Sequence, residues 1–318
     1  MSLTIGIDIG GTNVKGGVVD EQGHILESYR RPTPSTSVAE TATAIVETVE
    51  ALSANHPVTA VGLGAAGWIG VDRATVLFAP NLAWRDEPLR DRIRDRLADR
   101  LPLPVVVEND ANAAAWAEYK FGAAQGEAVV CLITLGTGIG GGLVIGGELF
   151  RGAYGIAPEF GHMRVVPDGR RCGCGNRGCW EQYASGKALI REAQDIATGA
   201  PLAAQRLLEV AGGKIHRIDG PLIMKVALDG DAAARECFDE VGRWLGQGIA
   251  DLASVFDPSC FVIGGGVAEA GALLLDPTRQ QYAAALSGRG HRPLARVVGA
   301  ALGPSAGLVG AADLARHR

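Results

Sequence analysis

The pattern of apolar and polar positions in the first 30 residues predicts three short strands. Residues 3–9 and 14–19 are apolar runs separated by G-G-T-N at 10–13, and a D-E-Q-G turn separates the second run from residues 24–29. Strand, tight turn and strand in this order predict an antiparallel meander. The glycine turn then joins two strands and opens no helix, which excludes a dinucleotide fingerprint and a P-loop.

Further along the chain, the hydrophobic spacing alternates between strand and helix periods, as in an α/β protein. Strand 105–109 runs directly into a strong helix former at 110–122, and residues 231–256 carry one long apolar face that stops before Pro258. The other predicted elements are helices at 36–54, 89–101 and 304–317, helical segments within 181–229, and strands at 58–63, 260–263 and 297–300.

The strand meander of the N-terminus has a second copy in the middle of the chain. Strand 129–135 meets the glycine-rich loop 136–142, and two further short apolar runs follow, separated by Gly-Gly. In both copies the apolar core of the second strand begins about eight residues after the first glycine of the loop. This shared register predicts an internal duplication, with a glycine turn that can cradle a phosphate in each copy.

Length and composition limit the kind of protein. The 318 residues predict two domains, and 47% hydrophobic residues can form large cores. The net charge of −5 and the lack of a dense Lys/Arg run argue against nucleic acid and membrane partners. No apolar run has the length of a membrane span, and the chain begins directly with a strand, so we expect a cytoplasmic protein.

The cysteines are divided between a metal-site pattern and single buried positions. Cys131, Cys237 and Cys260 stand alone in apolar surroundings and are expected to be buried thiols. The remaining three follow one histidine and complete a Cys₃His set: His162, Cys172, Cys174 and Cys179. Four protein ligands form a closed tetrahedral site, which predicts a structural Zn²⁺.

Two carboxylates flank this predicted zinc loop. Glu159 precedes His162 by three residues, and Glu181 follows Cys179 by two. A histidine that binds metal through one ring nitrogen carries N–H on the other, which normally donates to an acceptor. The zinc would thus hold two carboxylates and one oriented donor, an array that suits a polyol. The alternative is a zinc knuckle that only fixes a loop, with both glutamates solvated.

Asp110, at the end of a predicted parallel strand, has two compatible interpretations. It is expected to be the N-cap of the following helix, a favoured role for Asp. It also lies at the sheet edge where α/β proteins bind ligands, so an ionised Asp110 can serve as the base in phosphoryl transfer. Asp8, beside the first glycine turn, can hold Mg²⁺.

Other candidate positions are less specific. Gly264-Gly265-Gly266 follows a strand and allows either close approach of a nucleoside or a plain tight connection. Asn81 is an amide within an apolar loop. Arg151, Arg170 and Arg171 are expected to be solvated rather than to contact phosphate.

Five motifs together resemble the ROK family (repressors, open reading frames and sugar kinases). They are D-I-G-G-T-N, E-N-D-A-N-A-A, L-G-T-G-I-G-G-G, E-F-G-H and C-G-C-G-N-R-G-C-W-E, and they occur in the family's order along the whole chain. The likeness is greatest to the family's bacterial ATP-dependent glucokinases. One departure is Ala66 before Gly67, where relatives often have Pro.

The resemblance implies an α/β, actin-like (ribonuclease H-like) duplicated ATPase fold with two domains and a cleft between them. The small domain would be 1–112, completed by the C-terminal helix 304–318, and the large domain 113–303 would carry the zinc loop. The implied activity is ATP-dependent phosphorylation of the 6-hydroxyl of glucose, with Mg²⁺ and a structural Zn²⁺.

The resemblance also implies a role for each matching residue. Asp110 would be the catalytic base. The sugar contacts would be Asn81, Asn109, Asp110, Glu159, His162 and Glu181. The contacts to ATP and Mg²⁺ would be Asp8, Gly10, Gly11, Thr12, Asn13, Lys15, Thr137, Gly138, Gly264, Gly265 and Gly266. The zinc ligands would be His162, Cys172, Cys174 and Cys179.

Three alternatives stay open at this point. The sugar can be another hexose such as N-acetylmannosamine, fructose or allose, because the sequence does not fix the shape of the pocket. The donor can be polyphosphate. The chain can also be a sugar-responsive regulator without turnover, although it begins at the first strand without the extra DNA-binding segment of the family's repressors. We expect small-molecule partners only, and a homodimer or homotetramer.

Overall fold

The computed structural model describes residues 2–317, and its first sheet begins with the predicted meander. The strands are β1 (Leu3–Ile9), β2 (Asn13–Val19), β3 (Ile25–Pro32), β4 (Val58–Ala65) and β8 (Val105–Asn109). They lie in the order β3-β2-β1-β4-β8, with β1, β2 and β3 antiparallel and with β4 parallel to both β1 and β8. The antiparallel N-terminal meander is therefore confirmed.

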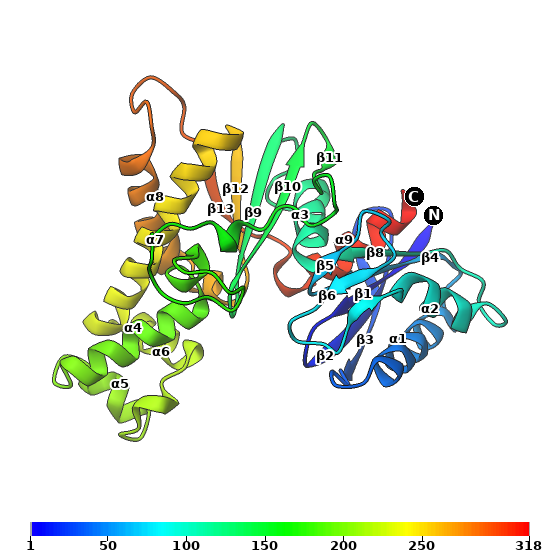
Figure 1. Cartoon of the computed structure of the whole chain (residues 1–318), viewed down its shortest axis with the longest axis horizontal. Coiled ribbons are helices and arrows are strands. Elements are labelled where there is room, and N and C mark those ends of the chain that lie inside the picture. Colours follow the sequence, from blue (N-terminus) through cyan, green and yellow to red (C-terminus); the bar gives the residue numbers. More distant parts are fainter. Residues whose placement is uncertain (1, 318) are drawn as a thin grey trace. The chain divides into compact units, whose positions relative to one another are not determined.

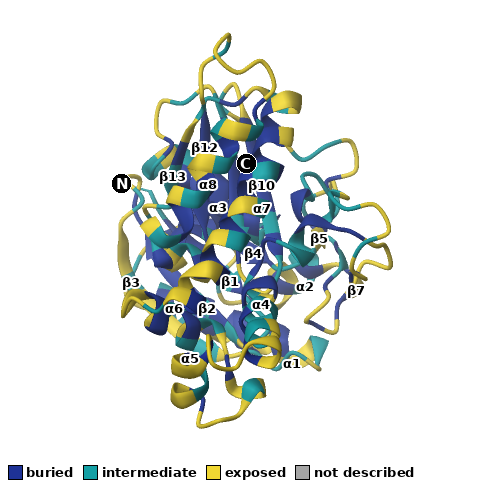
Figure 2. Cartoon of the chain, turned by 90° about the vertical axis from the view of Figure 1, so that its left-hand side faces the viewer, coloured by how far each residue is buried: buried dark blue, intermediate teal, exposed yellow. Residues whose placement is uncertain are grey.

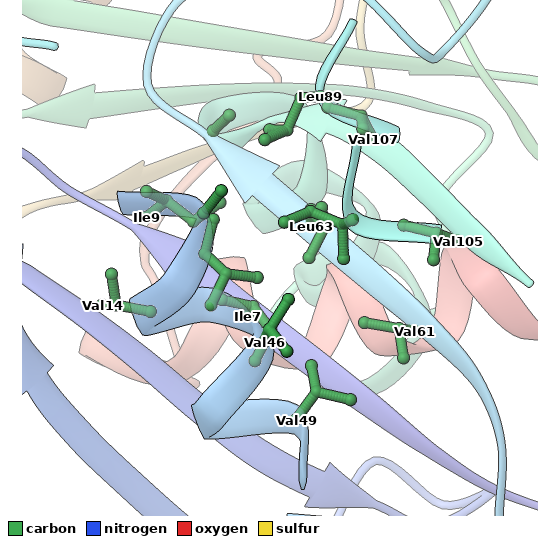
Figure 3. Close-up of a cluster of buried hydrophobic side chains, with 14 of the residues drawn as sticks. Ile7, Ile9, Val14, Val46, Val49, Val61, Leu63, Leu89, Val105 and Val107 are labelled. Carbon is green, nitrogen blue, oxygen red and sulfur yellow. The ribbon is translucent and has the colours of Figure 1, made fainter. Parts of the chain in front are cut away.

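Helices cover both faces of this sheet. On one face, α1 (Val38–Ser53) and α2 (Leu89–Leu97) bury their apolar sides in a core that includes Ile7, Val49 and Leu63 (Figure 3). On the other face, α9 (Ala306–Arg316) lies directly against the strands, because a side chain on Gly6 or Gly62 would overlap the backbone of this helix. α3 (Asp110–Phe121) packs against α9 (Figure 1).

The second sheet repeats the first. Its strands are β9 (Val129–Leu135), β10 (Ile139–Ile145), β11 (Glu148–Leu149), β12 (Cys260–Gly264) and β13 (Arg296–Gly299). Their order is β11-β10-β9-β12-β13, so each strand has a counterpart at the same place in the first sheet. The duplication read from the loop register is thus confirmed at the level of topology.

The chain between and after these strands is mainly helical. The helices are α4 (Gly186–Gly199), α5 (Gln205–Val210), α6 (Gly220–Leu228), α7 (Ala232–Phe256) and α8 (Ala272–Ala285). The long helix α7 packs on α8, and its outward residues are exposed while the strands beside it are buried (Figure 2). It ends as predicted before Pro258, at Asp257 in the left-handed conformation with φ 44°. Within residues 2–317, no helix combines the length and the apolar character that crossing a bilayer requires.

A small sheet and several short 3₁₀ helices complete the fold, and of these the small sheet was not predicted. A small sheet is formed by β5 (Trp68–Ile69), β6 (Val76–Phe78) and β7 (Arg85–Glu87). The short 3₁₀ helices are η1 (Phe160–His162), η2 (Trp180–Gln182), η3 (Ile215–Arg217), η4 (Gly266–Ala270) and η5 (Gly303–Ser305). The glycine triplet at 264–266 therefore leads into a 3₁₀ turn, and α8 begins only at Ala272.

By its internal contacts the chain forms two compact units. Unit 1 comprises residues 1–132, 142–158 and 301–318, and unit 2 comprises residues 133–141 and 159–300. The predicted boundaries at 112 and 303 instead separate one five-stranded sheet from the other, and this functional division stays a prediction.

Candidate active site

Asp110 is the first residue of α3 rather than its cap. The N-cap is Asn109, whose side-chain oxygen accepts a hydrogen bond from the backbone N–H of Asn112 at 3.0 Å. The predicted capping role of Asp110 is therefore wrong, because the amide one residue earlier takes it. Asp110 itself lies in the first turn, where the helix dipole favours a negative charge.

The orientation of the Asp110 carboxylate is fixed by its neighbours. Its Oδ1 accepts from the backbone N–H of Ala111 at 2.9 Å and lies 3.1 Å from Asn109 Nδ2. The same Asn109 amide donates to the carbonyl of Gly67 at 3.0 Å. Gly67 must be glycine, since its φ is 154° and a side chain there would overlap Phe78. Gly67, which follows Ala66, thus holds the Asn109 side chain in place through its carbonyl.

The first glycine turn lies beside a partly buried carboxylate. The turn is closed by a hydrogen bond of 3.0 Å from the Gly10 N–H to the Asn13 carbonyl. Asp8 precedes it, with Oδ2 3.9 Å from Lys15 Nζ on the adjacent strand. Burial raises the pKa of Asp8, and the Lys15 ammonium partly offsets this rise.

Two other parts of unit 1 converge on this turn. Asn81 lies against Gly11, since a Cβ on Gly11 would be 3.2 Å from that of Asn81. At the start of α9, a Cβ on Gly307 would be 3.7 Å from the Asp110 carbonyl and 3.8 Å from the Asp8 carboxylate. The fold therefore brings Asp8, Asn81 and Asp110, which are far apart in sequence, to the same end of the sheet.

The second glycine turn borders a large cavity within unit 2. The Gly136 N–H donates to the Gly138 carbonyl at 3.0 Å, which closes this turn one residue more tightly than the first. Gly136 and Thr137 line a cavity of about 840 Å³ together with residues of α4, α6 and η4. The lining residues are mostly apolar along the two α-helices, with Leu189, Ile190, Pro221, Met224 and Leu228 on them.

The predicted glycine triplet contributes to this cavity at one position. Gly266 lines it, as do Val267 and Glu269. Gly265 has φ 83°, and a side chain there would overlap the backbone of Leu135, so this glycine is needed for packing. Gly264 is buried at the end of β12. Among the described residues, Gly264 and Gly265 are not part of the cavity wall.

The predicted zinc ligands converge within unit 2. One ligand atom from each of His162, Cys172, Cys174 and Cys179 lies within 4.8 Å of the others. Cys172 Sγ is 3.7 Å from His162 Nδ1, and the Cys174 and Cys179 sulfurs are 3.6 Å apart. In tetrahedral zinc with Zn–S of about 2.3 Å and Zn–N of about 2.0 Å, the ligand atoms are about 3.5–3.8 Å apart. The donor set and these two spacings therefore fit zinc.

Both flanking glutamates lie next to this cluster. Glu159 Oε2 is 3.8 Å from His162 Nε2, the ring nitrogen that points away from the sulfurs, and Glu181 Oε1 is 3.0 Å from Cys172 Sγ. Glu181 also lies over the second glycine turn, because a side chain on Gly138 would overlap its Oε2. The preceding residue, Trp180, is buried against Gly248 of α7 and donates to the Trp244 carbonyl at 2.8 Å. The contacts of Trp180 with α7 thus support Glu181.

The sequence pattern of a known family covers nearly the entire chain. The ROK family pattern matches residues 4–318. The chain belongs to the ROK family. Over 317 residues it is 53% identical to the glucokinase of Streptomyces coelicolor, covering 100% of this chain and 98% of that protein.

Solved ROK structures agree with this assignment. One is the crystal structure of a ROK family glucokinase from Streptomyces griseus in complex with glucose and AMPPNP, with a TM-score of 0.90 and 55% identity over 100% of both chains. The ROK hexokinase from Thermus thermophilus has a TM-score of 0.78 at 35% identity, covering 99% of this chain and 98% of that one. The predicted fold is confirmed: the ROK chain has the duplicated, actin-like α/β architecture.

Some features of this ROK protein were not found from the sequence. Arg151, expected to be solvated, donates from Nε to the buried carboxylate of Glu108 at 2.7 Å. Lys187, Lys225 and Asp229 line the cavity although no glycine motif marks them. Arg170 and Arg171 are exposed, as expected. The three single cysteines, Cys131, Cys237 and Cys260, are buried as expected.

Proposed function

We propose that this ROK protein transfers the γ-phosphoryl group of ATP to the 6-hydroxyl of glucose. The observation that carries the proposal is its full-length match, at 55% identity, to a glucokinase crystallised with glucose and AMPPNP. In that complex, glucose is the acceptor of such a transfer, and AMPPNP stands in for ATP, the donor.

Asp110 is the proposed catalytic base. It accepts the proton of the 6-hydroxyl as the oxygen attacks phosphorus, and ADP leaves with the electrons of the broken P–O bond. The first turn of α3 supports its ionised form, and the hydrogen bond from Asn109 fixes its direction.

The nucleotide is proposed to bind at the glycine turns and the cavity. The apolar cavity in unit 2 suits adenosine, with Gly266 and Thr137 at its wall. The backbone N–H groups of Gly11, Thr12 and Gly138 suit phosphate oxygens, and the Gly10 N–H closes the first turn around them. Asp8, with Asn13 and Lys15 beside it, would hold Mg²⁺, which neutralises charge on the phosphates when bound.

The proposed sugar contacts fall into two groups. Asn81, Asn109 and Asp110 belong to unit 1, and Glu159, His162 and Glu181 belong to unit 2. In the second group the Cys₃His cluster would hold a structural Zn²⁺ that fixes the loop on which the glutamates lie. A carboxylate accepts from sugar hydroxyls, so two glutamates and an oriented imidazole N–H suit a polyol.

The test is to identify the product of the purified protein. With ATP and glucose we expect ADP and glucose 6-phosphate in equal amounts, measured by coupled ADP release and by phosphorus NMR. Parallel reactions contain N-acetylmannosamine, fructose or allose in place of glucose, or polyphosphate in place of ATP. A faster reaction with one of these would reassign the substrate, and binding of glucose without ADP formation would favour the regulator.

The assembly and the location of the protein stay predictions. Light scattering would test a homodimer or homotetramer, and cell fractionation would test a cytoplasmic location.

A further inference from the structure

Glu108 is a buried acidic residue next to the proposed active-site turn. It is the last residue but one of β8, two positions before Asp110, and only 2% of its surface is exposed. A buried carboxylate is costly unless its oxygens are paired with donors. The donors around Glu108 therefore show what the residue holds in place.

One oxygen of Glu108 binds the turn that carries Asp110. Oε1 accepts from the backbone N–H of Asn109 at 3.1 Å and from the Asn112 side-chain amide at 3.2 Å. These two residues lie on either side of Asp110. Asn109 in turn caps the helix and donates to the Asp110 carboxylate. The chain of contacts thus runs from Glu108 through Asn109 to the proposed base.

The other oxygen faces two guanidinium groups from separate parts of unit 1. Oε2 accepts from Arg151 Nε at 2.7 Å and lies 3.6 Å from Arg73 Nε. The longer distance is outside hydrogen-bonding range, so Arg73 contributes charge rather than a bond. With donors on both oxygens, Glu108 acts only as an acceptor, as a carboxylate does.

Both arginines are held by their own backbones. Arg73 has φ 51°, a conformation that is uncommon for a side chain of this size, and its carbonyl accepts from the Val107 N–H at 3.2 Å. The Arg151 carbonyl accepts from the Ala157 N–H at 3.1 Å, and the Arg151 side-chain Nη1 donates to the Leu149 carbonyl at 3.3 Å. Three chain segments therefore meet at one carboxylate behind the active-site turn.

We propose that Glu108 and Arg151 are positioning residues for phosphoryl transfer, which orient Asp110 through Asn109. The proposal rests on the proposed function. It follows from the contacts of the Glu108 carboxylate. This carboxylate holds the Asn109 backbone on one side of Asp110 and the Asn112 amide on the other. Loss of the bond from Arg151 leaves the carboxylate free to move. Small displacements of a reacting group can lower turnover by about 10²-fold.

The test is a double-mutant cycle between Arg151 and Asp110. We expect Arg151→Met to lower kcat about tenfold per folded molecule in the wild-type background, with a change below about threefold in the KM for ATP. In the Asp110→Asn background, where no base remains to be oriented, the same change should cost less than about twofold. Arg151→Lys, which restores the charge, should recover part of kcat.

A matched control removes another buried ion pair of unit 1. Asp313 is 2% exposed, pairs with Arg316 and accepts from Trp116 Nε1 at 2.8 Å, a bond that reaches α3 six residues beyond Asp110. Asp313→Asn should lower the melting temperature and leave kcat per folded molecule within about twofold. Circular dichroism gives the folded fraction of each variant.

The outcomes separate the two proposals. If the wild type forms no glucose 6-phosphate, the proposed function fails and the positioning role fails with it. If the wild type is active and Asp110→Asn is impaired, but Arg151→Met is silent or lowers kcat equally in both backgrounds, only the positioning role is overturned. Should Arg151→Met not fold, the same comparison is made with Glu108→Gln.

Discussion

Asn109 and Asp110 are neighbouring side chains with separate tasks at the start of α3. Asn and Asp are about equally favoured as helix caps, so either residue can begin the helix. In the structure the amide caps the helix through its oxygen and holds Asp110 through its nitrogen. The carboxylate is thereby left in the first turn, where it is proposed to serve as the base.

Replacement of that carboxylate tests its role directly. We expect Asp110→Asn to lower kcat by about 10²–10⁴, because a positioned base contributes roughly that factor. The KM for glucose should change little, since an amide still accepts from a hydroxyl. Steady-state kinetics measures both. Asp91→Asn, which removes a first-turn carboxylate from α2, is the matched control and should keep normal turnover. Near-normal kcat in Asp110→Asn would remove Asp110 from the mechanism.

Asp8 should make the protein less stable at neutral pH than an uncharged residue would. Burial raises its pKa, so the folded protein holds this proton more tightly than the unfolded chain does. The stabilising contribution of protonated Asp8 is present in full below the ordinary Asp pKa. It is lost as the pH rises through the pKa of Asp8 in the folded protein. We therefore expect Asp8→Asn to melt higher than the wild type at about pH 7–8, and the difference to vanish near about pH 4.

Thermal melts across this pH range measure the effect of Asp8. The same variant should lose phosphoryl transfer, since Asp8 is proposed to hold Mg²⁺. A lower melting temperature for Asp8→Asn at neutral pH would mean that the Lys15 contact outweighs the cost of burial.

Arg151 marks the limit of what could be predicted for single residues. Nothing local distinguishes it from Arg170 or Arg171, so all three were expected to be solvated. Its partner, Glu108, lies 43 positions earlier in the chain. Such a pair depends on how β8 and the segment after β11 are placed in unit 1, and this is tertiary information.

The elements that were predicted are those with a strong local signal. The meander strands β1 and β2 are seven residues long, with alternation in β1 and an apolar run in β2, and the long helix α7 has a continuous apolar face. The small sheet was missed because its strands have only two or three residues, too few for any period. The loop that carries His162, Cys172, Cys174 and Cys179 has almost no regular structure. The grouping of these four donors could still be predicted, because metal ligation depends on residue type and spacing.

Removal of one ligand tests the zinc loop as a unit. Cys174 is exposed, so Cys174→Ser changes the donor set with little effect on packing. We expect the zinc content to fall from one ion per chain to nearly none, and the KM for glucose to rise about tenfold as Glu159 and Glu181 lose their fixed support. Elemental analysis and steady-state kinetics measure these. Cys237→Ala, which removes a buried thiol in α7, is the control and should retain zinc. A folded, zinc-free protein with an unchanged KM would contradict the supporting role.

The complete molecule repeats one topology, and the chain passes between its two compact units at 132/133, 141/142, 158/159 and 300/301. A duplication of the strand order was predictable from the register of two glycine loops. The boundaries of the two units were not predictable, because they reflect the packing of α3 on α9. No local sequence pattern indicates this packing.

These repeated chain crossings predict that the two units unfold together. A ligand present at about 100 times its Kd adds about 2.7 kcal/mol to the free energy of unfolding. This energy stabilises every part of the protein that unfolds cooperatively with the binding site. With an unfolding entropy near 2.1 cal/mol/K per residue, that energy raises the melting temperature of all 318 residues by about 4 °C. The melting temperature of unit 2 alone, about half the chain, would rise by about 8 °C. We expect calorimetry with AMPPNP to show one transition that moves by the smaller amount. Two transitions in place of one would show that each unit melts independently and that the four backbone connections do not couple them.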